Sequence, residues 1–240
     1  MRPTLFIDQN AGLGDILFIQ KIIDRIINDG YDVLLPVVHE YKFIKDYIKK
    51  EHLNISIIDA NDRHTRNYIK NITANSTLPL HKSYDYYPHM NMMAAKYQML
   101  RMNYDNWQNH FTIIRNYEKE NKLVEQLGTR NKKYNLICNT LCTPPDQMQL
   151  KMDPVDNGLE KINISIIDEY SPFDWGTVIE NATNLYFVDT SFTYIIEKLT
   201  LKAENMFLYS RWHNDGGVHS SLQTMDFWSK PWKLYPVKSF

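Results

Sequence analysis

The sequence LFIDQNAGLGD at residues 5–15 joins an apolar run to a glycine-containing turn and to the start of a strongly periodic segment. The apolar run predicts a β-strand, and the periodic segment predicts a helix. Gly12 and Gly14 predict a tight turn with positive φ that a bulky ligand can approach, with unpaired N–H groups of the helix start directed at it. Asp15 would repel a phosphate there, and the third glycine of dinucleotide-binding fingerprints is missing. We therefore expect the turn to present an acidic group and not to hold a pyrophosphate.

A parallel sheet is predicted for the residues that follow. Isoleucines recur at helical spacing between 19 and 27, and Gly30 is placed to end that helix. Residues 32–38 (DVLLPVV) and 54–59 (NISIID) predict strands, and residues 41–50 between them predict a helix. Such an alternation of strand and helix is typical of a parallel α/β sheet.

The middle of the chain, residues 79–128, predicts helices laid over one end of this sheet. Met and Tyr are frequent at 81–97, and helical stretches are expected at 96–102, 104–117 and 118–127. The region also contains hydrogen-bonding side chains suited to a carbohydrate or another polar substrate. The candidates for binding such a substrate are Asp85, His89, Lys96 and Arg115. The alternative is that the aromatic side chains form core and the charged ones face solvent.

A second alternation of strands and helices occupies the rest of the chain. Strands are expected at 134–138, 162–168, 185–189 and 205–209, and helices at 174–182 and 192–199. The string NISIID at 54–59 recurs at 163–168, and both copies are expected to have the same structural role. The aromatic C-terminal tail is expected to pack back over both halves. The sequence therefore predicts an α/β protein with two halves, residues 1–128 and 129–240.

Asp189, Thr190 and Ser191 lie between a predicted buried strand and a predicted helix. Ligands of open α/β sheets bind beyond the carboxyl ends of the strands, where hydroxyls and free N–H groups can hold anions. These residues predict a cradle for a diphosphate, and the alternative is that Thr190 or Ser191 simply caps the helix. Thr140, after the first strand of this half, would add a hydroxyl, and Arg211, after the last, would add a positive charge.

Composition excludes several classes of protein. Lys and Arg number 27 against 28 Asp and Glu, so no overall positive field attracts nucleic acid, and we expect no nucleic-acid partner. Cys138 and Cys142 support neither a disulfide framework nor a zinc site, which favours free thiols in the cytoplasm. No window approaches about 20 consecutive apolar residues, so no transmembrane segment is expected.

The chain resembles the glycosyltransferases of the GT-B fold, and in layout the bacterial heptosyltransferase-like group of the ADP-heptose:LPS type. The resemblance rests on the Gly-Leu-Gly-Asp turn at 12–15 with its helix, and on residues 175–199. In that group the second segment forms a helix ending in a small residue, a strand, an Asp-Ser/Thr-Gly motif and a donor-binding helix. The resemblance implies two Rossmann-like halves whose parallel sheets face each other across a cleft, with acceptor-side residues 1–128 and nucleotide-sugar-binding residues 129–240.

The resemblance also implies chemistry: a nucleotide-diphosphate sugar as donor, a hydroxyl of a glycan or lipopolysaccharide-type acceptor, and no cofactor. Asp15 would be the general base that takes the proton of the acceptor hydroxyl. Asp189 would touch the donor sugar, and Thr140, Thr190 and Ser191 would bind the diphosphate. An acceptor bound to a membrane would be reached by peripheral contact.

We further expect the transfer to need no metal. The sequence contains no Asp-x-Asp motif, which glycosyltransferases of the other large fold class use to hold a metal ion. Helix N-termini, hydroxyls and basic side chains would then stabilise the leaving diphosphate. Ser191 stands where the related group usually has Gly, and the His that typically follows is absent. Two alternatives stay open: a non-catalytic or degenerate sugar-nucleotide-binding module, and a sugar-nucleotide epimerase or hydrolase on the same fold.

Overall fold

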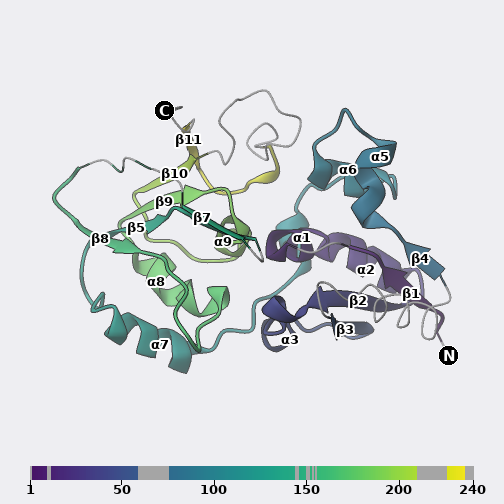
Figure 1. Cartoon of the computed structure of the whole chain (residues 1–240), viewed down its shortest axis with the longest axis horizontal. Coiled ribbons are helices and arrows are strands. Elements are labelled where there is room, and N and C mark those ends of the chain that lie inside the picture. The colour runs from purple at the N-terminus through teal and green to yellow at the C-terminus, as the bar shows by residue number, and fades with distance from the viewer. Residues whose placement is uncertain are drawn as a thin grey trace. The chain divides into compact units, whose positions relative to one another are not determined.

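The computed structural model describes residues 2–9, 12–58, 76–143, 146–149, 152, 154, 156–209 and 226–235. The chain divides into two compact units, Met1–Ile114 and Arg115–Phe240, and each contains its own parallel β-sheet (Figure 1).

The sheet of the first unit has four parallel strands in the order β3-β2-β1-β4. The strands are β1 (Thr4–Ile7), β2 (Asp32–Val38), β3 (Leu53–Ile58) and β4 (Ser76–Leu78). Because β1 lies between two neighbours, the loop that follows it emerges in the interior of the carboxyl edge of the sheet, where ligands of parallel sheets bind. The three strands expected from the sequence are confirmed, and β4 is an addition to them.

The first unit also contains short helices and 3-10 turns. They are α1 (Leu13–Phe18), α2 (Gln20–Asn28), α3 (Ile44–Tyr47), α5 (Ser83–Tyr86) and α6 (Met92–Gln98), with 3-10 turns η1 (His39–Tyr41), η2 (Leu80–Lys82) and η3 (Trp107–His110). The isoleucine stripe is confirmed, since Ile19, Ile22, Ile23 and Ile26 are buried. Gly30 has a φ of 97°, a left-handed conformation that favours glycine after the end of α2.

Two predicted helices are much shorter than expected. Residues 41–50 contain only the end of η1 and α3, because the backbone becomes extended directly after α3. Residues 104–117 form only η3 before α7 begins, because Asn106 is left-handed with a φ of 57°. The ring of Trp107 is fully buried, with its centroid 5.2 Å from that of Phe18. Aromatic packing in this segment therefore outweighs helical propensity.

The second unit has a five-stranded parallel sheet in the order β11-β10-β9-β5-β8. Its elements are α7 (Tyr117–Gln126), β5 (Tyr134–Cys138), β8 (Glu160–Asn163), η4 (Pro172–Trp175), α8 (Gly176–Asn181), β9 (Asn184–Val188), α9 (Ser191–Ile196), β10 (Asn205–Tyr209) and β11 (Lys233–Tyr235). An antiparallel pair, β6 (Thr140–Thr143) and β7 (Asp146–Gln149), is inserted after β5. The predicted strands that became β5, β9 and β10 are confirmed to within one residue.

The expected strand at 162–168 was wrong in its position. The edge strand β8 ends at Asn163, and Ile166 beyond it is 66% exposed. The first copy of NISIID lies almost entirely in β3, whereas only the first residue of the second copy lies in a strand. The two copies therefore have different roles, because Asn163 already pairs with Ile137 and β5 ends one residue later, at Cys138.

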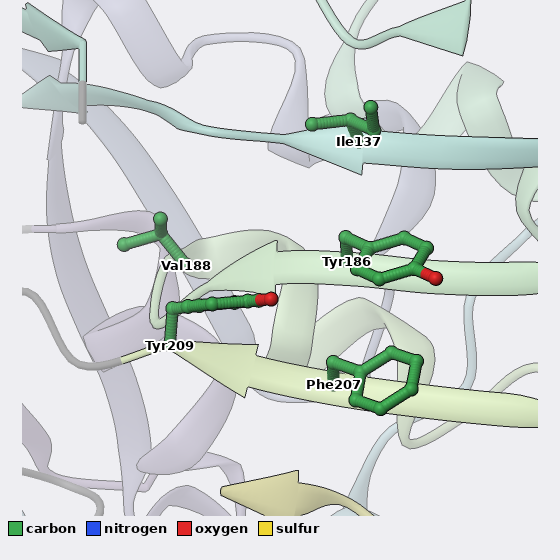
Figure 2. Packing of buried hydrophobic residues seen from close by; sticks show 5 residues of the cluster. All are labelled: Ile137, Tyr186, Val188, Phe207 and Tyr209. Atoms are coloured by element: carbon green, nitrogen blue, oxygen red, sulfur yellow. The ribbon is translucent and has the colours of Figure 1, made fainter. Parts of the chain in front are cut away.

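One face of the second sheet is covered by a cluster of large apolar side chains. Figure 2 shows its members on the three neighbouring strands β5, β9 and β10: Ile137, Tyr186, Val188, Phe207 and Tyr209. The rings of Tyr186 and Phe207 are stacked, with centroids 4.8 Å apart. Because these residues alternate along each strand, they keep one face of the sheet apolar up to its carboxyl edge.

Asparagines at the other end of the same face fix the register of these strands. Asn184 Nδ2 donates to Asn135 Oδ1, and Asn205 Nδ2 donates to Asn184 Oδ1, each at 2.9 Å. Asn135 and Asn184 are buried, so a shifted strand would leave their amides unsatisfied. These amide hydrogen bonds therefore fix the register of β5, β9 and β10, so that the carboxyl ends of the three strands lie at one edge of the sheet.

The second unit begins earlier than the expected division after residue 128. Helix α7 belongs to it, and the guanidinium of Arg115 pairs with Glu120 of α7 and Glu180 of α8. Glu120 Oε2 also accepts from the backbone N–H of Thr177 at 2.8 Å. These contacts attach the start of the second unit to α8.

The described part of the tail packs against α9. The carboxylate of Glu197 accepts hydrogen bonds from the backbone N–H of Ser229 and from the indole of Trp232. The ring of Trp228 meets that of Tyr194 edge to face, with centroids 4.9 Å apart. Residues 226–235 thus pack within the second unit, and residues 210–225 lie outside the described residues.

Candidate functional site

Asp15 lies in the first turn of α1, just beyond the carboxyl end of β1. Gly12 is the residue before the helix, with φ of −87° and ψ of 152°, and Gly14 is buried inside it. The positive φ expected of these glycines was wrong, since the described glycines with positive φ are Gly30, Gly128 and Gly158. A residue with a side chain could adopt the extended φ and ψ of Gly12. Backbone conformation therefore does not explain a glycine at this position.

The explanation is the side chain of Asp15. A Cβ atom at Gly12 would lie 2.9 Å from Asp15 Oδ2, closer than ordinary van der Waals contact. The missing side chain at Gly12 therefore leaves space in front of this oxygen. The described part of the turn thus presents Asp15 beside Gly12 without the left-handed backbone that the sequence predicted, and the approach of a ligand stays a prediction.

The structure brings Asp15 together with Lys96, another of the candidates. Lys96 lies on α6, whose start is fixed by Asn91 accepting a hydrogen bond from Met93 N at 2.9 Å. Its ammonium forms an ion pair with Asp15 Oδ1 and contacts Met93 Sδ at 3.5 Å. The side chain of Lys96 is only 1% exposed, whereas that of Asp15 is 25% exposed. A buried ammonium is costly without a counter-ion, so this carboxylate is a structural requirement of Lys96.

A second pair, between an acid and an imidazole, lies at the same edge of the sheet. Asp8 follows β1, and its backbone N–H donates to Leu78 O of the neighbouring β4. His81 Nδ1 lies 3.1 Å from the backbone oxygen of Asp8 and 3.4 Å from its Oδ2. Both of these oxygens are hydrogen-bond acceptors, so Nδ1 is placed to donate to them. Sequence reasoning missed this pair because the short strand β4 that places His81 there has no long apolar run.

The other acceptor-side candidates do not join Asp15. Asp85 and His89 are exposed, on α5 and in the turn after it, and neither is bonded to Asp15 or Lys96. Arg115 belongs to the second unit, where two glutamates engage its guanidinium. Burial disfavours its charge, yet the hydrogen bonds that its guanidinium donates to Glu120 and Glu180 hold the pKa of Arg115 above the ordinary value.

The donor-side candidates meet at the carboxyl edge of the second sheet. Thr140 follows β5 and Asp189 follows β9, and these strands are neighbours with Cys138 opposite Phe187. Cys138 is a buried free thiol, and its Sγ is 4.0 Å from Thr190 Oγ1. The hydroxyls and the carboxylate therefore lie where ligands of parallel sheets bind.

The capping alternative for Thr190 is confirmed. Its Oγ1 accepts a hydrogen bond from Phe192 N at 3.3 Å, and it precedes α9 as the N-cap residue. Thr190 and Asp189 are buried, and Ser191 and Thr140 are half-buried. Arg211 lies outside the described residues. Within the described ranges, no group of three His, Cys, Asp or Glu side chains could hold a metal ion.

Comparisons with solved structures bear on the fold. Over 99% of this chain and 88% of the other, the structure is similar to a glycosyl transferase family 9 protein from Veillonella parvula, with a TM-score of 0.56 and 7% identity. The fold is that of the GT-B glycosyltransferases. This confirms the predicted fold class, including two α/β halves with parallel sheets.

Two further similarities are weaker. E. coli heptosyltransferase WaaC with ADP matches 97% of this chain and 90% of its own length, with 9% identity and a TM-score of 0.46. The iron-containing dodecameric glycosyltransferase TibC from enterotoxigenic E. coli has 10% identity and a TM-score of 0.46, over 87% of this chain and 58% of TibC. No protein-family model matches the sequence, and no curated protein sequence matches it.

Among the described residues, none of the helices has both the length and the apolar character needed to cross a bilayer.

Proposed function

We propose that this protein is a metal-independent glycosyltransferase that moves a sugar from a nucleotide-diphosphate sugar to a hydroxyl acceptor. The observation that carries the proposal is the carboxylate of Asp15, half-open beside Gly12 at the carboxyl edge of a parallel sheet in a GT-B fold. The resemblance of the sequence points to the same residue as the base. A glycan or lipopolysaccharide-type acceptor is the class that we propose, with peripheral contact where the acceptor is held in a membrane.

In the proposed reaction, Asp15 accepts the proton of the acceptor hydroxyl as its oxygen attacks the anomeric carbon of the donor. The bond between that carbon and the diphosphate oxygen breaks, and its electron pair leaves with the diphosphate. Hydroxyls of Thr140, Thr190 and Ser191 would bind the leaving diphosphate, helped by the charge of Arg211. Asp189 would contact the donor sugar.

Thr190 is already engaged as a helix cap, which limits what it can add. A hydroxyl oxygen that accepts from Phe192 N can still donate its own proton to a phosphate oxygen. Capping and diphosphate binding are therefore compatible in one side chain.

A thermal-shift screen is the first test. Nucleoside diphosphates and nucleotide sugars are added with EDTA and, in parallel, with Mg²⁺ or Mn²⁺, because a ligand that binds the native state raises its melting temperature. We expect one nucleotide to raise it equally in both conditions. A shift that requires the metal would contradict metal-independent binding.

Transfer is then measured with the bound nucleotide sugar against a panel of hydroxyl acceptors. We expect Asp15→Asn to abolish transfer and to keep nucleotide-diphosphate affinity. Full transfer by Asp15→Asn would show that Asp15 is not the base. Binding without turnover would favour a degenerate binding module, and product formed without any acceptor would favour an epimerase or hydrolase.

A further inference from the structure

The two carboxylate oxygens of Asp15 lie in different surroundings. Oδ1 is bonded to the ammonium of Lys96, which is 1% exposed and has no other anionic partner among the described residues. Oδ2 lies on the side of Gly12, where a Cβ atom would come within 2.9 Å. Within the described part of the chain, Oδ2 accepts no hydrogen bond. One oxygen is therefore fixed and the other is open.

We propose that Lys96 is a positioning residue for the transfer reaction, and that Gly12 keeps the path to Asp15 Oδ2 clear for the acceptor hydroxyl. This inference rests on the proposed function. Lys96 itself is too deeply buried to bind the acceptor, so it acts through Asp15. The acceptor hydroxyl donates its hydrogen bond to Oδ2 from the side that Gly12 leaves open.

The ion pair between Asp15 and Lys96 also determines when the proton of the acceptor hydroxyl is transferred. Full protonation of Asp15 would leave the ammonium of Lys96 buried without its counter-ion, which is costly. The acceptor O–H bond therefore breaks late, as the new bond to the anomeric carbon forms and the diphosphate departs with the electron pair of the old one. The proton on Oδ2 passes to water once the product has left, which restores the pair.

The first experiment compares Lys96→Met and Lys96→Arg with the unmodified protein. We expect Lys96→Met to lower kcat at least about tenfold and to leave the donor KM unchanged, because Asp15 is no longer held in place. Lys96→Arg keeps the charge beside Asp15 Oδ1 and should restore most of kcat. Lys50→Met is the matched control, because Lys50 pairs with Asp24 in the same unit and should leave both kcat and KM unchanged. An unchanged kcat in Lys96→Met, or a loss that Lys96→Arg does not restore, would overturn the inference.

The second experiment tests Gly12. Its backbone conformation is open to alanine, so Gly12→Ala should keep the fold and the nucleotide affinity while transfer falls at least tenfold. Unchanged transfer by Gly12→Ala would overturn the assignment of Oδ2 as the reacting oxygen.

A third measurement needs no transfer at all. Melting temperatures are compared for Asp15→Asn, Lys96→Met and the double variant. If the pair is formed, Asp15→Asn leaves the buried ammonium of Lys96 without its counter-ion and lowers the melting temperature. The double variant removes that ammonium as well, so it should be no less stable than Asp15→Asn alone. Additive losses would overturn the pairing itself. Coupled losses in a protein that transfers no sugar would overturn the proposed function and, with it, the positioning role of Lys96.

Discussion

The guanidinium of Arg115 lies directly against Gly176 at the start of α8. A Cβ atom at Gly176 would fall 2.8 Å from Arg115 Cζ, where no real Cβ could remain. The guanidinium cannot easily withdraw, because Glu120 and Glu180 hold it from two sides. Glycine is thus required at the helix start by the ion pair packed against it.

Gly176→Ala is accordingly predicted to destabilise the protein by about 1–3 kcal/mol, the usual range for overpacking a filled site. Urea unfolding followed by circular dichroism measures the loss. In an Arg115→Met background the same substitution should cost clearly less, because the rigid neighbour is gone. Equal costs in the two backgrounds would mean that Arg115 does not press on this position.

Arg115→Met is predicted to affect stability and not acceptor binding. It leaves Glu120, only 1% exposed, without its cationic partner, and breaking a buried pair in this way costs about 3–5 kcal/mol. The matched control is Arg130→Met, whose exposed pair with Glu125 should be worth no more than about 1 kcal/mol. A raised acceptor KM without loss of stability would instead assign Arg115 to the acceptor.

Tyr134 is predicted to make stability fall in alkali. Its hydroxyl donates to Val178 O at 2.5 Å, and burial raises the pKa of Tyr134 to about 12. A raised folded-state pKa adds stability that is complete below pH 10 and is lost as the pH rises through 12, about 2–3 kcal/mol in all. Unfolding free energies between pH 9 and 12 should fall more steeply for the native protein than for Tyr134→Phe. Parallel curves would contradict this.

Three substitutions at Thr190 separate capping from diphosphate binding. Thr190→Val removes the acceptor of Phe192 N and should cost about 1 kcal/mol of stability together with nucleotide affinity. Thr190→Asp still caps α9 but places a negative charge beside the diphosphate, so it should keep the melting temperature and lose affinity. Thr190→Ser should keep both. Native affinity in Thr190→Asp would remove this residue from the diphosphate site.

The fold was predictable where the sequence pattern is local. The continuous apolar runs that became β2, β5 and β10 mark strands buried on both faces, and their boundaries follow from sequence alone. Residues 104–117 show helical spacing, but the burial of Trp107 depends on Phe18, far away in the chain. Contacts of that kind leave no local pattern to detect.

The candidate site was predictable in part for the same reason. Asp15 and Thr190 each follow a strand and could be named from their position in the α/β alternation. The pairing of Asp15 with Lys96 joins residues 81 positions apart, and the space beside Gly12 depends on a side-chain conformation. The roles predicted for Asp15, Asp189 and the hydroxyls stay predictions until binding and transfer are measured.

The division between Ile114 and Arg115 has a consequence for how such a chain can change. Every described strand of one sheet precedes this point, and every described strand of the other follows it. A single splice there exchanges a whole hydrogen-bonded sheet without cutting any strand pairing. Recombination at this one position is therefore enough to join either unit to a new companion with its own sheet intact.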